Sequence, residues 1–392
     1  MASAEQMILG DVVRFGNGKS IKPGGEGLYP VYGSNGIIGG SNEFRHENGV
    51  VIGRVGAYCG AVFYCPTKFW ASDNTLVAYP ASEQVDTKFL YYLLTDAKLS
   101  RYAGGAAQPL VTQTVLRQVE VRVPTLLVQQ RIAGILSAYD ELIENNQRRI
   151  MVLESMARTL YREWFVHFRF PGHENHPRVA SSLGEIPQGW EVKKLSAVAE
   201  VNRAQINARS APEELHYIDI SSVSPGQIDR ITTYAFADAP GRARRVVQHG
   251  DVLWSCVRPN RRSHAQMMHP EPNTIASTGF AVLTAKKVPF TFLYFATTTD
   301  DFVAYLTNNA TGAAYPAVTA ATFEKAELLV PPAPLLLKFG DAAIPMAEGI
   351  HTLQRQTQNL HHTRDLLLPR LLSGLNVLPR SINQSTALGG NQ

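Results

Sequence analysis

The chain has 392 residues, of which 45% are hydrophobic and 18% charged, and its formal net charge is +4 at pH 7. This composition excludes a largely disordered protein, and the length exceeds what one hydrophobic core usually supports, so we expect two or more domains. Because no apolar run approaches the roughly 18–20 residues of a membrane span and residues 1–10 lack the features of a signal peptide, we expect a cytoplasmic protein with no membrane partner.

The first part of the chain, up to Pro124, predicts mixed α/β structure that is rich in turns. Glycines mark the bends between its apolar runs, and one later stretch, residues 87–99, has its apolar side chains at helical spacing. The apolar runs that predict strands are residues 50–53, 61–64 and 75–79.

After Pro124 the chain predicts one long helix with two apolar rows that repeat every seven residues. A seam of this kind, on a helix of roughly 35–40 residues and ~50–60 Å in length, does not remain exposed to water. Asn146 weakens the packing of the seam but helps to fix the register of a paired helix. The residues that we predict for this seam are Ile132, Leu136, Tyr139, Ile143, Asn146, Ile150, Leu153 and Leu160.

A second long helix follows Pro331 and carries a matching seam, which Thr357 and Arg364 interrupt. Two helices with matched seams favour pairing with each other. An antiparallel pairing would relate the two domains by a pseudo-two-fold axis, which is also the symmetry of duplex DNA. The alternative is that each helix packs only on its own domain. The seam residues predicted here are Phe339, Met346, Ile350, Leu353, Leu360 and Leu367.

The second helix ends a duplication of the first half of the chain. Residues 105–111, Gly-Ala-Ala-Gln-Pro-Leu-Val, return as Gly-Ala-Ala-Tyr-Pro-Ala-Val at residues 312–318, and the Val-Pro pair before each long helix is repeated at the same offset of 207 residues. A repeat this long is a duplicated domain with its helix, not a solenoid unit of ~20–50 residues. Residues 251–254 and 280–283 predict strands that match those of the first copy.

Six arginines gather between residues 242 and 262, with a single acid, Asp251, among them. Arginine forks fit phosphate oxygens and the O6 and N7 atoms of guanine, and Asn260 has the donor and acceptor that fit adenine. A charge run is often only a solvated face, but a cluster of one sign beside a predicted strand favours contact with DNA. The arginines are Arg242, Arg244, Arg245, Arg258, Arg261 and Arg262.

No catalytic constellation stands out in the sequence. The three cysteines have no CxxC spacing and predict free thiols. Residues 15–20 end like a phosphate-binding loop, but Val13 stands where that motif requires glycine. The catalytic tetrad of adenine methyltransferases is absent as well, so we expect a protein without catalytic, metal or cofactor residues of its own.

Several motifs of the first half carry a resemblance to a known family. They are Tyr-Pro-Val-Tyr-Gly-Ser-Asn-Gly-Ile-Ile-Gly at residues 29–39, Val-Ile-Gly-Arg-Val-Gly at 51–56, Trp-Ala-Ser-Asp-Asn-Thr-Leu at 70–76, Val-Arg-Val-Pro at 121–124 and Gln-Gln-Arg-Ile at 129–132. With the long helix that follows, they resemble a target-recognition domain and the central conserved region of type I restriction-modification specificity subunits. The resemblance covers the chain to about Gly374, in the family's order of domain, helix, domain and helix.

The resemblance implies an α/β (α+β) fold of two similar mixed α/β target-recognition domains, separated by two long helices that form an antiparallel coiled coil with pseudo-two-fold symmetry. The divisions are residues 1–124 for the first recognition domain, 125–170 for the central conserved helix, 171–330 for the linker and second recognition domain, 331–376 for the distal conserved helix and 377–392 for a disordered tail.

The resemblance also implies a function without catalysis. In this family each recognition domain reads one half of a split, asymmetric site in double-stranded DNA, and the helices dock two methyltransferase (M) subunits. Those subunits bring S-adenosylmethionine, and restriction (R) motor-nuclease subunits add translocation and cleavage driven by ATP and Mg. The second half departs from the family pattern at residues 336–339, where Leu-Leu-Lys-Phe replaces Gln-Gln-Arg-Ile.

In the first domain the candidates for DNA contact lie on glycine-rich loops, because loops placed by a rigid scaffold usually carry recognition. For each of them an ordinary turn position remains an alternative. Two other functions also stay open on the residues alone: a coiled-coil adaptor for other proteins, and a fused DNA methyltransferase or nuclease with an unrecognised site. The candidates are Lys19, Ser20, Lys22, Tyr32, Ser34, Asn35, Arg45, Arg54, Lys68 and Gln108, together with Tyr315 at the position equivalent to Gln108 in the second copy.

Overall fold

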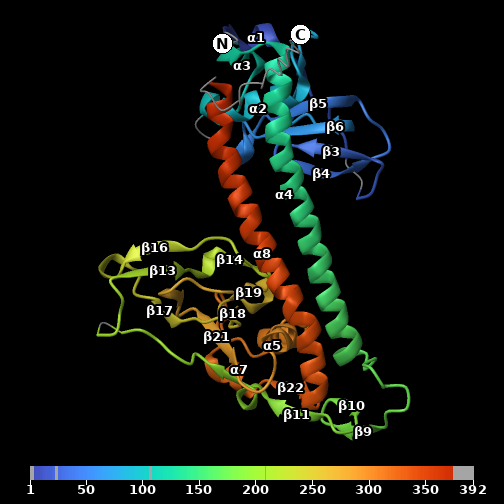
Figure 1. Cartoon of the computed structure of the whole chain (residues 1–392), viewed down its shortest axis with the longest axis vertical. Helices are drawn as coiled ribbons and strands as arrows, with labels where there is room; N and C mark the ends of the chain where they lie inside the picture. The colour runs from blue at the N-terminus through green and yellow to red at the C-terminus, as the bar shows by residue number, and fades with distance from the viewer. Residues whose placement is uncertain (1–3, 23–24, 106–107, 208, 374–392) are drawn as a thin grey trace, which may run out of the picture. The chain divides into compact units, whose positions relative to one another are not determined.

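The computed structural model describes residues 4–22, 25–105, 108–207 and 209–373, so the predicted tail, residues 377–392, lies outside the described residues. The chain divides into two compact units (Figure 1). The first unit combines Met1–Asn145 with Gln356–Gln392, and the second is Asn146–Arg355. Both long helices, α4 (Leu126–Tyr161) and α8 (Ala333–Leu372), contribute to each unit.

The first unit is built on a six-stranded sheet in the order β2-β7-β5-β6-β3-β4. In β5 the side chains of Val50, Val51 and Ile52 are fully buried, as expected for a strand covered on both faces. All three strands predicted for this part of the chain are confirmed. The strands are β2 (Val13–Asn17), β3 (Tyr29–Gly33), β4 (Gly36–Ser41), β5 (His46–Gly53), β6 (Val62–Ala71) and β7 (Thr75–Pro80).

A helix and a short ladder connect this sheet to the first long helix. The helix α2 (Thr87–Asp96) begins at Asp86, whose carboxylate accepts the backbone N–H of Phe89 at 2.7 Å and so satisfies an N-terminal donor. The strands β1 (Glu5–Ile8) and β8 (Glu120–Val123) pair antiparallel immediately before α4. The predicted helix at residues 87–99 is therefore confirmed as far as Asp96, and a separate 3-10 turn begins at Leu99.

Gln129, the first residue of the Gln-Gln-Arg-Ile motif, has a structural role at the start of α4. Its side chain donates to the backbone oxygens of Gln84 and Pro124 at 2.9 and 2.8 Å and accepts the N–H of Asp86 at 2.9 Å. The glutamine is 1% exposed and ties the start of α4 to the cap of α2. In the second copy the equivalent residue is Leu336, which joins the hydrophobic core instead.

The second unit repeats the central sheet of the first. Its strand order β12-β21-β18-β19 corresponds to β2-β7-β5-β6, and the pair β11-β22 corresponds to β1-β8. The strands that we predicted at residues 251–254 and 280–283 are confirmed as β18 and β21, and the two similar mixed α/β domains are confirmed with them. These strands are β11 (Glu191–Lys194), β12 (Ala199–Val201), β18 (Val252–Ser255), β19 (His264–Gln266), β21 (Phe280–Ala285) and β22 (Glu327–Val330).

The two copies differ in what surrounds the shared strands. The first has the hairpin β3-β4 added to its sheet, whereas the second has a separate four-stranded sheet in the order β16-β13-β20-β17. The other elements of the second unit are β9 (Arg178–Ser181), β10 (Gly184–Pro187), β13 (Glu214–Ile218), β14 (Val223–Ser224), β15 (Gln227–Ile228), β16 (Thr232–Ala235), β17 (Ala243–Val246), β20 (Thr274–Ser277), α5 (Phe290–Thr297), α6 (Asp300–Asn308) and α7 (Ala320–Lys325).

The long helices pack against each other in each unit. In the first unit, Leu368 near the end of α8 shares a core with Ile132 near the start of α4. In the second unit, Phe339 near the start of α8 lies 6.1 Å, between ring centroids, from Tyr161 at the end of α4. Start meets end in both cases, so the helices run antiparallel. The same cores include residues of the sheets and their helices, so each helix packs on its neighbouring domain as well as on its partner.

Every residue of the two predicted seams is buried or half-buried. The polar seam residue Asn146 is buried as well, with 7% of its surface exposed. The buried members are Ile132, Leu136, Ile143, Asn146, Phe339 and Leu353, and the half-buried members are Tyr139, Ile150, Leu153, Leu160, Met346, Ile350, Leu360 and Leu367.

Arg364, which interrupts the second seam in the sequence, has partners on the opposite helix. Its guanidinium donates to the Asp140 carboxylate at 2.7 Å, and the hydroxyl of Tyr92 donates to the other carboxylate oxygen at 2.5 Å. Burial of the Tyr92 hydroxyl, together with the adjacent Asp140 carboxylate, raises its pKa. A polar position satisfied in only one alignment of two helices favours that register.

Within the described parts of the chain, no helix combines the length and apolarity needed to cross a membrane.

Candidate DNA-recognition surfaces

In the first domain, the turn between β6 and β7 brings together residues from three loops. The backbone N–H of Lys19 donates to Ala71 O at 2.9 Å, just before this turn. Within the turn, Asn74 O accepts two hydrogen bonds, from Ser34 Oγ at 2.7 Å and from the backbone N–H of Arg54 at 2.9 Å. The structure thus places the predicted Lys19, Ser34 and Arg54 around one turn.

Glycine makes this close approach of loops possible. A Cβ atom on Gly18 would lie 1.8 Å from Ser72 O, so no other residue fits beside the turn. The hairpin turn that carries Ser34 and Asn35 ends at Gly36, whose φ of 103° favours glycine. The glycine-rich motifs of the first domain therefore shape the loops on which the polar candidates lie.

The duplicated loop docks in the same way in both domains. In the first, the backbone N–H of Gly56 donates to Pro109 O at 3.0 Å; in the second, that of Arg258 donates to Pro316 O at 2.7 Å. Gln108 and Tyr315, which precede these prolines, are both exposed. The two copies consequently present different side chains from equivalent backbone positions.

The other candidates of the first domain occupy varied environments. Tyr32 is only 7% exposed and packs edge-on against Phe69 in the core, where burial raises the pKa of its hydroxyl. The guanidinium of Arg45 lies 5.5 Å from the ring centroid of Trp70, while the ammonium of Lys68 lies 4.4 Å from that of Phe44. Arg45 and Lys68 are thus held on aromatic faces. Ser20, Lys22 and Asn35 are exposed.

In the second domain, the turn between β20 and β21 joins the two halves of the arginine cluster. The backbone N–H of Thr278 donates to Arg242 O at 2.8 Å, and that of Cys256 donates to Gly279 O at 2.8 Å. Burial raises the pKa of the Cys256 thiol to about 11, and the positive charge of nearby Arg245 opposes this shift. Arginines that are separated by more than a strand in the sequence therefore lie around one turn.

Arg258 is held by two contacts with the duplicated loop. Its guanidinium lies 4.5 Å from the ring centroid of Tyr315 and donates to Ala314 O at 3.2 Å. The backbone of Arg258 is left-handed, with φ of 51°, where the chain enters the 3-10 turn Pro259–Arg261. Tyr315, predicted separately from the duplicated loop, thus acts as the stacking platform for a predicted arginine.

The remaining members of the cluster differ in how freely their charges face solvent. Arg262 contacts the Asp300 carboxylate at 2.5 Å. Arg244 packs on the ring of Phe236, and Nε of Arg245 is buried without a hydrogen-bond partner among the described residues. Those at exposed positions are Arg242, Asn260 and Arg261.

The acid and the histidine beside these arginines point into the core. Asp251 is 1% exposed and accepts hydrogen bonds from Thr284 Oγ1 at 2.7 Å and from the N–H of Gln248 at 2.8 Å. Burial raises its pKa to about 6 despite these bonds. Burial, together with the charges of Arg158 and Arg262, lowers the pKa of His264 to about 4. His264 is therefore neutral at pH 7, and the positive surface consists of arginines.

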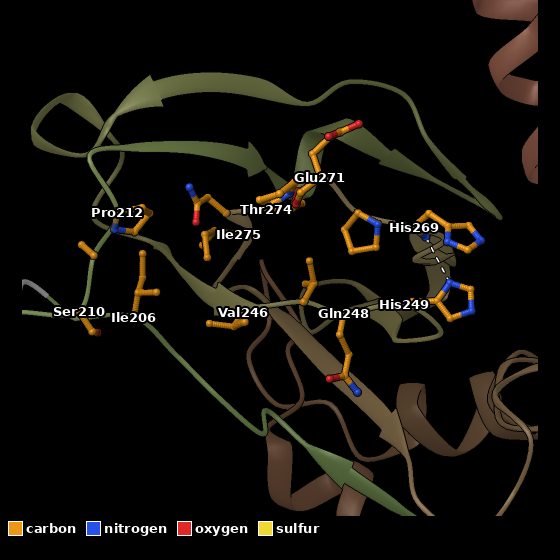
Figure 2. Close-up of a pocket in the computed structure, with 15 residues that line it drawn as sticks. Ile206, Ser210, Pro212, Val246, Gln248, His249, His269, Glu271, Thr274 and Ile275 are labelled. Carbon is orange, nitrogen blue, oxygen red and sulfur yellow. Dashed lines mark hydrogen bonds between the residues drawn. The ribbon is translucent and has the colours of Figure 1, made fainter.

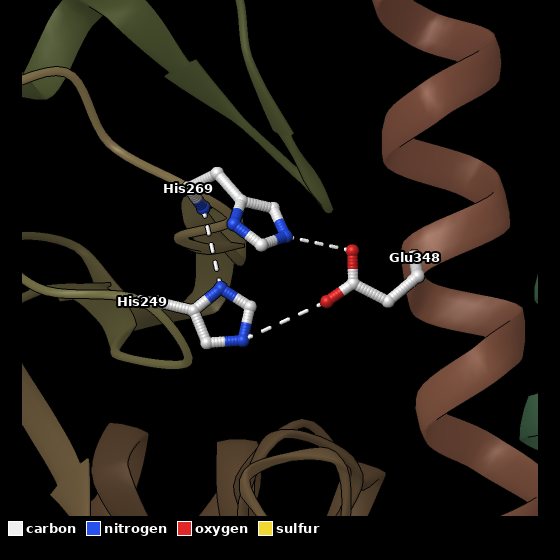
Figure 3. Close-up of side chains that lie close together, drawn as sticks. All are labelled: His249, His269 and Glu348. Carbon is white, nitrogen blue, oxygen red and sulfur yellow. Dashed lines mark hydrogen bonds and ion pairs between the residues drawn. The ribbon is translucent and has the colours of Figure 1, made fainter.

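The second unit also contains a hollow of about 670 Å³ that no pattern in the sequence predicts. His249 and His269 lie at one end of it, and Ile206 and Ser210 at the other (Figure 2). The two imidazoles also contact the carboxylate of Glu348 in α8 (Figure 3). The three residues come from distant segments without a spacing motif, so only the fold brings them together.

Comparisons with known proteins relate the chain to a family. Residues 3–155 match the family model of the type I restriction modification DNA specificity domain. The chain is 26% identical over 306 residues to the type I restriction enzyme MjaIX specificity subunit of Methanocaldococcus jannaschii, which covers 74% of this chain and 69% of that protein. It is 32% identical over 132 residues to the EcoprrI specificity subunit of Escherichia coli, which covers 33% of each.

The fold is also that of a solved structure. The chain resembles the type I restriction-modification system S subunit from M. genitalium with a TM-score of 0.66 at 16% identity, over 95% of this chain and 96% of that chain. This likeness confirms the two-domain α/β architecture predicted from the sequence, and the match of residues 3–155 to the family model bears out the predicted family resemblance.

Proposed function

Residues 3–155 match the specificity domain of type I restriction-modification systems, and from this premise we propose that the chain is a specificity subunit that selects a bipartite, asymmetric sequence in double-stranded DNA. In this proposal it also docks two methyltransferase subunits and the restriction subunits. It contributes no catalytic group. S-adenosylmethionine binds to the methyltransferase subunits, and ATP and Mg²⁺ bind to the restriction subunits. Each recognition domain reads one half of the site.

The duplicated loop carries this proposal. Its backbone docks identically in both domains, through Pro109 O in the first and Pro316 O in the second. The side chains at equivalent positions nevertheless differ, because Gly56 corresponds to Arg258 and Gln108 to Tyr315. One scaffold that presents two unlike sets of side chains fits two unlike half-sites, and this predicts an asymmetric target.

The charges of the second domain support DNA as the ligand. Arg242 and Arg261 are exposed, and the guanidinium of Arg258 is stacked on the ring of Tyr315. Contacts with phosphates would supply much of the affinity and make it fall with salt, while contacts with base edges would supply the sequence preference. Because the target adenine must leave the base stack to be methylated, we further propose that the bound chain eases this flipping for the methyltransferase.

The outer face of α4 supports docking of a partner protein. Met151, Val152 and Met156 are 60%, 56% and 50% exposed. A contiguous group of large exposed apolar side chains often marks an interaction surface, and methionine is common in such interfaces. Substitution of Met156 by Glu should reduce co-purification of the methyltransferase subunit.

Mapping of methylated adenines tests the central proposal. The chain and its methyltransferase partner are expressed in a host that lacks adenine methylation, and the genome is sequenced by a method that detects N6-methyladenine. We expect one motif of two defined and different halves around an unspecified spacer. A contiguous motif, a palindromic motif or no new methylation would overturn the bipartite, asymmetric reading.

A further inference from the structure

We propose that His249, His269 and Glu348 form a binding site for a divalent transition-metal ion, and that Zn²⁺ fits it best. His249 follows β17, His269 follows β19, and Glu348 lies on α8. All three belong to the second unit. Figure 3 shows the carboxylate projecting from the helix towards both imidazoles.

The distances suit a single small ion. Nε2 of His269 lies 2.7 Å from Oε2 of Glu348, and Nε2 of His249 lies 3.7 Å from Oε1. One ligand atom from each residue can be chosen so that all lie within 4.8 Å of one another. Tetrahedral Zn²⁺ with bonds of about 2.0–2.1 Å holds its ligand atoms roughly 3.3 Å apart. Side-chain movements on the order of 1 Å therefore bring the three residues onto one ion.

The donor set selects the class of metal. Two imidazoles and one carboxylate suit Zn²⁺ and its transition-metal neighbours, whereas Ca²⁺ and Mg²⁺ prefer sites made of oxygen. Three protein ligands leave a fourth position open, and the hollow in Figure 2 adjoins it on the side of His249 and His269. Water or a ligand that enters from the hollow can occupy this position.

His351 adds a second, independent observation. It follows Glu348 by three residues, a spacing that puts both side chains on one face of α8. Its ring centroid lies 5.4 Å from that of His269, and its Nε2 is buried with no hydrogen-bond partner among the described residues. A buried imidazole nitrogen without a partner costs free energy, and a nearby metal ion, or water bound to one, removes that cost.

One hydrogen bond must change when the metal binds. The backbone N–H of His269 donates to Nδ1 of His249 at 3.3 Å, which keeps the proton of His249 on Nε2. Coordination through Nε2 moves that proton to Nδ1 and gives up this hydrogen bond. The bond is long and therefore weak, but the two N–H groups would then face each other, so the His249 ring must turn away from the His269 N–H when the metal binds. The bound metal then fastens two loops of the second recognition domain to α8.

Metal titration of the full-length protein tests the site. The protein is prepared without a histidine tag, treated with EDTA, dialysed and titrated with Zn²⁺ against a chromogenic chelator, and Co²⁺ serves as a spectroscopic probe. We expect one tight equivalent. His269→Ala and Glu348→Gln should each weaken Zn²⁺ binding at least tenfold, since loss of even an outer-shell group costs 10- to 100-fold. His173→Ala, in the linker, is the matched control and should bind as the wild type does.

Thermal unfolding separates loss of a ligand from loss of the fold. Without metal, Glu348→Gln should unfold near the wild-type temperature, and Zn²⁺ should raise the unfolding temperature of the wild type but not that of the variant. If Glu348→Gln fails to fold, His249→Gln takes its place. The proposal is overturned if the wild type does not bind Zn²⁺ stoichiometrically, or if these variants bind it as tightly as the wild type. The methylated motif is measured separately, so failure of this site leaves the proposed DNA recognition standing.

Discussion

Arg258 offers the sharpest test of how the second domain reads DNA. Its guanidinium is already stacked on Tyr315 and bonded to Ala314 O, so little side-chain freedom is lost when it meets a base. A bidentate contact with guanine contributes about 1–3 kcal/mol of discrimination. We therefore expect Arg258→Ala to weaken binding to the cognate sequence by roughly 5- to 150-fold, because 1.4 kcal/mol corresponds to a factor of ten.

The assay is fluorescence anisotropy with two duplexes at several salt concentrations. One duplex contains the motif found by methylation mapping, and the other has the half-site of the second domain scrambled. Lys286→Ala is the matched control, since its ammonium already contacts the Glu200 carboxylate at 3.1 Å and lies outside the arginine cluster. We expect Lys286→Ala to lose less than about 0.5 kcal/mol on either duplex.

The comparison between duplexes decides the role of Arg258. A loss confined to the cognate duplex supports base reading. An equal loss on both, with a shallower dependence on salt, would show that Arg258 contacts phosphate instead. If Arg258→Ala binds both duplexes as the wild type does, the reasoning from its ordered position is refuted.

Three further predictions concern stability, each followed by urea unfolding with tryptophan fluorescence. Asp140→Asn should lower the unfolding free energy by about 1–2 kcal/mol because Arg364 loses its ion pair with the opposite helix. Asp365→Asn removes only the exposed ion pair that Arg364 makes within α8 and should change the unfolding free energy little; equal effects would contradict this account. Phe339→Ala should cost about 3–5 kcal/mol, since the ring is fully buried, and a cost under 1 kcal/mol would show that the site collapses. The raised pKa of Asp251 means that its carboxyl stabilises the fold when protonated and that this contribution is lost as pH rises through about 6; Asp251→Asn should therefore gain about 1 kcal/mol relative to the wild type between pH 5 and pH 8, and a constant difference would contradict the shift.

The sequence by itself determined the repeated architecture. Hydrophobic periodicity is local, so the strands near Val50 and Thr75 and the long helices with their seven-residue rows were predicted from residues a few positions apart. The offset between Gly105 and Gly312 revealed the duplication, which is confirmed by the matching strand orders of the two sheets. Long amphipathic helices and repeats can be recognised in the sequence, because their related residues recur at a fixed spacing.

Only the tertiary structure decided which polar residues meet. In the sequence Arg364 only interrupts an apolar seam, whereas in the structure it forms an ion pair with Asp140. Tyr315 is predicted only as a loop residue, whereas in the structure Arg258 stacks on its ring. The grouping of His249 with Glu348 depends on the packing of a loop against a helix almost a hundred residues away. Such contacts join segments with no common period, so their geometry is set by how the sheets and helices pack, and no local pattern in the chain records it.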